Sequence, residues 1–159
     1  EYRFFADFTP AATGLGLYSN TALDVMGAEP ASEVIAEAHQ LSWVKTVEDC
    51  RFEMQPKEGI VRAGKEAQIT LSITRLDGGA VALRPVMGAY AHVVAFDEAR
   101  TGFAHLHPQE VDLTEPPDAV NPKLTFRITI PTAGRYVTWA QINLDGTELF
   151  APFRFEVMP

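Results

Sequence analysis

The sequence predicts an all-β protein: an immunoglobulin-like antiparallel β-sandwich with an extra N-terminal β-hairpin and a short helix or linker. Two observations from about residue 48 onward predict the sandwich. Short segments alternate apolar and polar residues, as half-buried strands do, and Gly, Pro and Asp turn signals separate them at roughly 10-residue spacing. Seven such segments over about 110 residues match the strand count and the size of an immunoglobulin-like domain.

Each strand is predicted from its own alternation and from the turn that ends it. In Ala67–Arg75, the residues Ile69, Leu71 and Ile73 fall on one face, and the turn Asp77-Gly78-Gly79 follows. The strands predicted in this way, in chain order, are 49–55, 67–75, the two arms of a hairpin within 92–107, 124–130, 135–144 and 149–157.

Residues 1–29 are predicted to form the N-terminal hairpin, with strands Tyr2–Phe8 and Leu15–Val25 around a Pro10–Gly14 loop. This hairpin resembles the end of a preceding immunoglobulin-like domain, because Tyr2–Phe8 lines up with residues 136–142. A two-stranded hairpin is at best marginally stable alone. We therefore expect it to join the sheets of the main domain, of a second copy in a homo-oligomer, or of a partner protein.

Residues 30–47 are predicted to be a linker, with a short helix within it as the alternative to an irregular segment. Apolar residues recur at helical spacing in Ala31–His39, and Pro30 suits the first helical position. The sandwich itself is assigned to residues 48–159.

The composition excludes several classes of function. The net charge is −8, and no cluster of Lys or Arg occurs, which disfavours nucleic-acid binding. No stretch approaches the roughly 18 apolar residues of a membrane span. The single cysteine, Cys50, cannot form an intramolecular disulfide and is interpreted as an inert thiol. A start at Glu1 rather than Met is typical of a processed or truncated chain, and no signal peptide lies within the sequence.

Three of the four histidines lie within one 16-residue window, and they are the candidate metal ligands: His92, His105 and His107. The polar residues 97–100 predict a hairpin turn of two or four residues, which places His92 directly opposite His105. His107 falls on the same face, about 6.5–7 Å further along its strand. Neutral imidazole suits both copper and zinc. Three such nitrogens leave a fourth coordination position open.

Three further residues are weaker candidates for this site. Met87 supplies a thioether that favours Cu(I), but regular alternation puts it on the opposite face unless the strand bulges at Gly88. Glu110 is a candidate ligand or a carboxylate that orients an imidazole. Tyr90 lies opposite His107 in the predicted register and is a candidate hydrogen-bond partner. The alternative interpretation of each is a core or solvated residue.

The residues around the histidines resemble a known signature. Met87-Gly-Ala-Tyr-Ala-His-Val-Val and then Phe103-Ala-His-Leu-His-Pro are similar to a GAxxHxV…HxHP pattern in uncharacterised secreted bacterial proteins with an immunoglobulin-like fold. The closing segments Pro131-Thr-Ala-Gly-Arg-Tyr and Ala151-Pro-Phe-Arg-Phe-Glu-Val also match. Ala91 stands where that family usually has glycine, a departure that bears on the backbone beside His92.

That family is loosely associated with copper and heavy-metal handling. The resemblance implies a periplasmic or secreted protein in which His92, His105 and His107 bind a transition metal, copper in preference to zinc. The expected function is metal buffering or transfer without catalysis. The alternatives are a structural or protein-interaction module that binds no metal and, more remotely, a zinc- or copper-dependent enzyme. An enzyme needs a general base and a substrate pocket, and the sequence indicates neither.

Overall fold

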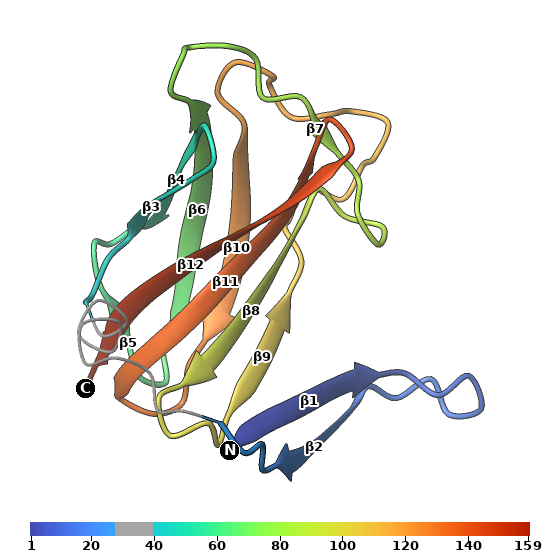
Figure 1. Ribbon diagram of the computed structural model, residues 1–159, viewed down its shortest axis with the longest axis vertical. Coiled ribbons are helices and arrows are strands. Elements are labelled where there is room, and N and C mark those ends of the chain that lie inside the picture. Colours follow the sequence, from blue (N-terminus) through green and yellow to red (C-terminus); the bar gives the residue numbers. More distant parts are fainter. Residues whose placement is uncertain (28–39) are drawn as a thin grey trace. The chain divides into compact units, whose positions relative to one another are not determined.

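The computed structural model describes residues 1–27 and 40–159 and divides the chain into two compact units, one within residues 1–39 and one within residues 40–159 (Figure 1). Every regular element among the described residues is a β-strand, so the all-β prediction is confirmed. The helix predicted over Ala31–His39 lies outside the described residues. No helical segment in the described ranges has the length and apolar character of a membrane span.

The first unit is the predicted N-terminal hairpin. Strand β1 (Tyr2–Phe8) pairs antiparallel with β2 (Leu17–Leu23) along its whole length. The connecting loop is closed by hydrogen bonds from the N–H groups of Thr13 and Gly14 to the carbonyl of Pro10, at 3.1 and 2.9 Å. Gly14 adopts a φ of 66°, which a residue without a Cβ reaches at no steric cost.

One face of this hairpin is apolar and exposed. The register brings alternate residues of the two strands onto that face. Their side chains retain roughly half of their accessible surface: Tyr2 63%, Phe4 54%, Phe8 47%, Leu17 44% and Leu23 51%.

The second unit is a β-sandwich of two sheets. Its strands are β3 (Val44–Val47), β4 (Cys50–Pro56), β5 (Val61–Arg62), β6 (Glu66–Arg75), β7 (Leu83–Arg84), β8 (Ala91–Asp97), β9 (Phe103–Leu106), β10 (Lys123–Thr129), β11 (Gly134–Leu144) and β12 (Thr147–Met158). One sheet has the order β10-β6-β4-β3, and the other has the order β5-β12-β11-β8-β9 with β7 added to β11 (Figure 1). All pairings are antiparallel except that of β5 with β12.

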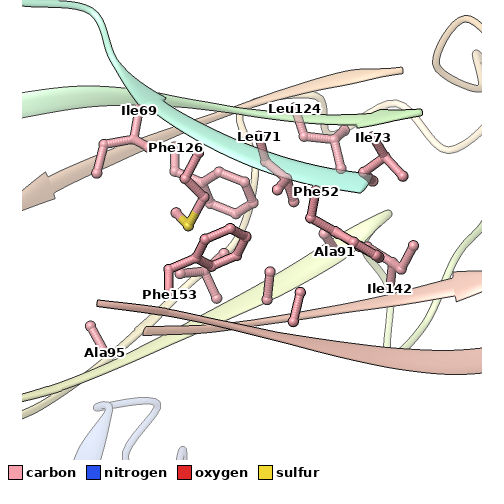
Figure 2. Close-up of a cluster of buried hydrophobic side chains, with 14 of the residues drawn as sticks. Phe52, Ile69, Leu71, Ile73, Ala91, Ala95, Leu124, Phe126, Ile142 and Phe153 are labelled. Carbon is pink, nitrogen blue, oxygen red and sulfur yellow. The ribbon is translucent and has the colours of Figure 1, made fainter. Parts of the chain in front are cut away.

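The core lies between the two sheets and follows from the alternation in the sequence. In β4, buried and more exposed residues alternate along the strand, and Phe52 is completely buried. Figure 2 shows side chains of the two sheets pointing toward one another, among them Phe126 from β10 and Phe153 from β12. The strands that border this core therefore present their other face outward.

Residues 40–47 also take part in the sandwich. Strand β3 pairs with β4, and Ser42 forms an isolated bridge to Arg154 of β12. The ring of Trp43 stacks on Phe155 at a centroid distance of 4.6 Å. Strand β3 is a short edge strand with two exposed central residues, so its sequence carries little of the alternation that marked the longer strands.

The register of the β8–β9 hairpin differs from the predicted one by two residues. Val94, and not His92, lies opposite His105. The prediction was wrong because it assumed a turn of two or four residues, whereas six residues, 97–102, separate the paired ends of the strands. A shift by two residues preserves the alternation of side chains, so His92 and His105 still share one face of the sheet.

The longer loop is held by the side chain of Asp97. Its carboxylate accepts hydrogen bonds from the N–H of Thr101 at 2.6 Å, from the N–H of Gly102 at 3.1 Å and from the Thr101 hydroxyl. The N–H of Arg100, which has a φ of 58°, donates to the Asp97 carbonyl at 3.0 Å. The carboxylate thus accepts hydrogen bonds from loop N–H groups that backbone carbonyls would accept in a shorter turn.

Replacing Asp97 with asparagine should destabilise the domain by about 1 kcal/mol at neutral pH, the usual net contribution of such hydrogen bonds. Partial burial acts to raise the pKa of this carboxyl, but hydrogen bonds from Thr101 and Gly102 outweigh it and lower the pKa below its ordinary 3.8. Because the folded-state pKa is lowered, the stabilisation is present above the unfolded-state pKa and is lost as the pH falls through the folded-state value. Urea unfolding of both proteins from neutral to strongly acidic pH should show their unfolding free energies converging in acid. A difference that is independent of pH would contradict this account.

Candidate metal centre

Three histidines meet on the outward face of the larger sheet. Ala91 and Val93 of β8 point into the core, so the intervening His92 points to the other side of the sheet. His105 lies on the neighbouring strand β9, and His107 follows directly after that strand. The candidate ligand nitrogens of the three rings all lie within 4.8 Å of one another.

The three rings form a compact group. Their centroids are 5.1 Å apart for His92 and His105, 4.6 Å for His92 and His107, and 4.9 Å for His105 and His107. The His107 ring stands edge-on to the other two, at 88° and 82°. The structure therefore brings together all three predicted ligands, although by a register other than the predicted one.

His92 is held through both of its ring nitrogens. It is 4% exposed, and both of its ring nitrogens have partners. Its Nε2 lies 2.8 Å from the carbonyl oxygen of Val86, and its Nδ1 lies 2.9 Å from Nε2 of His105. A carbonyl oxygen only accepts hydrogen bonds, so Nε2 of His92 carries a proton. In the neutral ring, the lone pair of Nδ1 is then directed at His105.

A tight turn fixes the carbonyl to which His92 donates. Val86 and Ala89 exchange backbone hydrogen bonds of 2.8 and 3.1 Å, and the two central residues, Met87 and Gly88, have φ values of 46° and 83°. Two successive positive φ values are typical of a type I′ turn. The sequence analysis missed Val86 as a partner, because methionine is not a residue that indicates a left-handed turn position.

The distance between the two facing nitrogens suits a hydrogen bond and is close to what a metal requires. Two imidazole nitrogens on one tetrahedral zinc ion, each at 2.0–2.1 Å, are roughly 3.3 Å apart. The observed separation of His92 Nδ1 and His105 Nε2 is 2.9 Å. If the two rings moved apart by a few tenths of an ångström, an ion would fit between the two nitrogens. The same pair can thus share a proton or coordinate a metal.

The exposure of the three side chains increases across the group. His92 is buried, His105 is half-buried and His107 is exposed. The group is therefore closed on the side of the turn at Val86 and open to solvent on the side of His107.

Glu110 and Tyr90 hold the loop that follows the site, and the carboxylate of Glu110 does not belong to the group of candidate ligands. The carboxylate of Glu110 accepts a hydrogen bond of 2.8 Å from the N–H of Thr125 at the start of β10. Tyr90 is 2% exposed, belongs to the hydrophobic core and donates its hydroxyl to the carbonyl of Leu113 at 2.9 Å. Both residues support the site through the backbone.

Met87 and Cys50 lie in environments that differ from that of the three rings. Met87 is 70% exposed at the tip of the turn, so no bulge directs it into the sheet face. Cys50 is buried in the core of the sandwich. Burial raises the pKa of its thiol, and Asp49 adds to that effect. A thiol with a raised pKa is a poor nucleophile at neutral pH.

The solved structures that are similar to this chain include two of low sequence identity. One is described as a "Putative Lipoprotein from Bacillus anthracis", with 12% sequence identity, a TM-score of 0.42, and coverage of 83% of this chain and 97% of that one. The other is a DUF4426 family protein from Pseudomonas aeruginosa PAO1, with 16% identity, a TM-score of 0.42, and coverage of 74% and 98%.

A comparison with curated proteins found no match. A family model does match, over residues 45–159. This range includes all three histidines and every strand of the sandwich apart from the first residue of β3. The chain therefore belongs to the family described as Domain of unknown function (DUF8832).

Proposed function

We propose that this domain binds one transition metal ion, copper or zinc, through His92, His105 and His107, and that it serves in metal buffering or transfer. The observation that carries the proposal is the arrangement of His92. Its Nε2–H is fixed on the Val86 carbonyl, and its Nδ1 faces a second imidazole nitrogen at 2.9 Å. Histidine ligands in metalloproteins are characteristically held in this way, with the second ring N–H donated to a backbone carbonyl or carboxylate.

The donor set favours copper over zinc. Three neutral imidazole nitrogens suit both ions, but Cu(II) binds nitrogen donors more tightly than Zn(II) in the Irving–Williams order. The resemblance to secreted proteins associated with copper handling supports the same preference and a periplasmic or secreted location. The exposed side of the site at His107 supports an ion that enters and leaves.

A carrier of this kind needs no catalytic partner for the metal. Glu110, the carboxylate considered for the site in the sequence, is engaged with the backbone of Thr125 at 2.8 Å. We therefore propose a non-catalytic role, and a metal-dependent enzyme remains the remote alternative. Turnover that a chelator abolishes would establish that alternative instead.

One observation favours a second candidate function. The separation of 2.9 Å between His92 Nδ1 and His105 Nε2 is a favourable hydrogen-bond distance without any ion. In that case the three rings form a hydrogen-bonded network that fixes β9 against β8 in a structural or protein-interaction module. Metal ions would then leave the stability of the domain unchanged.

Calorimetric titration of the metal-stripped protein with Cu(II) and Zn(II) separates the two functions. We expect one ion per chain and an affinity loss of about 100-fold in His105→Ala, the upper range for loss of a group that supports a metal site. Gln141→Ala is the matched control, because Gln141 lies opposite His92 in the β8–β11 ladder while its amide is bonded to Glu148 at 2.8 Å. The control should bind as the wild type does. Absence of binding by the wild type would leave the structural module as the function.

A further inference from the structure

A pocket of about 500 Å³ lies where the chain crosses between the two sheets, and residues within 56–68 line it. Strand β4 belongs to the smaller sheet, β5 pairs with β12 at the edge of the larger sheet, and β6 returns to the smaller one. Because β5 and β9 are opposite edges of the larger sheet, the pocket is separate from the three histidines (Figure 1). Small-molecule sites typically have volumes of roughly 300–1,000 Å³, so the pocket is large enough for a ligand.

The backbone that frames the pocket is fixed by hydrogen bonds to both sheets. The N–H of Lys57, directly after the last residue of β4, donates to the carbonyl of Gln68 in β6 at 2.9 Å. The N–H of Ala63, directly after β5, donates to the carbonyl of Met158 at the end of β12 at 2.8 Å. A ligand that enters a frame held in this way does not have to order the loops around it.

Cationic side chains gather in this pocket, although the chain as a whole has a net charge of −8: Lys57, Arg62 and Lys65. The lining also contains two carboxylates, Glu58 and Glu66, and that of Glu66 is paired with Arg127 at 3.6 Å. In the part of the chain that the structure describes, neither lysine of the pocket takes part in an ion pair. Their ammonium groups are therefore available to an anionic ligand.

The third cation of the pocket is oriented by the backbone. The Nη1 of Arg62 donates a hydrogen bond to the carbonyl oxygen of Pro159 at 3.2 Å. A guanidinium has five N–H donors in a planar arrangement that matches carboxylate and phosphate groups, so donors remain for a ligand. The lining also includes the apolar residues Pro56, Ile60 and Ala67, and Ile60 is 45% exposed. The pocket thus combines donors for an oxyanion with an apolar surface.

We propose that this pocket binds a small organic anion, in which a carboxylate or phosphate group is joined to an apolar portion. Lys57, Arg62 and Lys65 bind the anionic group, and Ile60 contacts the apolar portion. The carboxylate of Glu58 disfavours a polyanion such as a nucleic acid, because like charges repel. The proposal does not depend on the metal centre, and it gives the domain a second ligand of different chemistry.

The test is a titration of the ¹⁵N-labelled, metal-stripped full chain with phenylacetate, phenyl phosphate and inorganic phosphate, followed through the amide NMR shifts. We expect saturable shift changes that are concentrated in residues 56–68. At least one of the two organic anions should bind more tightly than inorganic phosphate, because only an organic anion can contact Ile60. The organic anion that binds more tightly identifies the preferred anionic group.

Two double variants separate binding in the pocket from a general effect of charge. Lys57→Gln/Lys65→Gln should weaken binding of the tighter organic anion about 10-fold, since one exposed ion pair changes an affinity by up to about 5-fold. The other two lysines of the chain provide the matched control, because both are exposed and lie outside the pocket. Lys45→Gln/Lys123→Gln should bind as the wild type does. Both variants should melt with the wild type, since exposed side chains contribute little to stability.

Three results would overturn the proposal. Equal weakening in the two double variants would show that binding follows the net charge of the chain and not the pocket. Inorganic phosphate that binds as tightly as both organic anions would exclude a role of the apolar lining. Amide shifts of residues 56–68 that respond to none of the three anions would show that the pocket binds no such ligand.

Discussion

Replacing His92 with alanine should abolish tight metal binding and at the same time destabilise the metal-free domain. The substitution removes the ligand nitrogen that faces His105 and one of the two donors to the Val86 carbonyl, which keeps its hydrogen bond from the N–H of Ala89. Losing a hydrogen bond costs about 0.5–1.5 kcal/mol, and truncating a side chain that is only 4% exposed adds the cost of the cavity left behind. Titration calorimetry measures the first effect, and urea unfolding in the presence of a chelator measures the second.

The exposed member of the group provides the matched control for stability. His107→Ala also removes one imidazole from the cluster, but from its solvent-exposed side, so its free energy of unfolding in the metal-free state should stay within about 0.5 kcal/mol of the wild type. If His92→Ala binds copper or zinc within a few-fold of the wild-type affinity, His92 is not a ligand and the proposed site is wrong.

Much of this site could be predicted from the sequence, because successive residues of a strand alternate between the two faces of the sheet. Whether the histidines share a face depends only on this alternation along the two strands. His92, His105 and His107 were expected on one face, and the two-residue shift in register preserved that face. A shift of the β8–β9 register by one residue would have placed His92 on the opposite face of the sheet from His105 and His107. The loop length that caused the shift depends on the hydrogen bonds of Asp97 to Thr101 and Gly102, which no alternation pattern encodes.

The supporting contacts of the site were not predictable in the same way. The Val86 carbonyl reaches His92 because Met87 adopts a left-handed conformation that its residue type does not indicate. Glu110 and Tyr90 were considered as neighbours of the histidines, but their partners, Thr125 and Leu113, lie distant in sequence. Such long-range contacts depend on how a loop crosses from one sheet to the other.

Deletion of residues 1–25 should lower the melting temperature or change the mass of the protein in solution. The hairpin of β1 and β2 exposes five large apolar side chains on one face, each 44–63% accessible. Two strands do not sustain a stable structure in water without such a face being covered. We therefore expect this face to contribute to folding or to association. Each kcal/mol lost should lower the melting temperature of a domain of this size by about 4 °C.

Single substitutions on the two faces of the hairpin sharpen this prediction. Phe4 and Thr21 pair on the apolar face, whereas Asn20 pairs with Phe5 on the opposite one. Phe4→Lys should reproduce the effect of the deletion in calorimetry and light scattering, and Asn20→Lys should not. A deletion variant with the melting temperature and solution mass of the wild type would show that the hairpin contributes to neither folding nor association.

The most direct test of the proposed site is the ¹⁵N NMR spectrum of the histidine side chains with and without one equivalent of Zn²⁺. The account predicts that Nδ1 of His92, Nε2 of His105 and one nitrogen of His107 change to metal-bound shifts, while Nε2 of His92 keeps its proton on the Val86 carbonyl. Unchanged imidazole shifts at one equivalent, or coordination of His92 through Nε2, would contradict it.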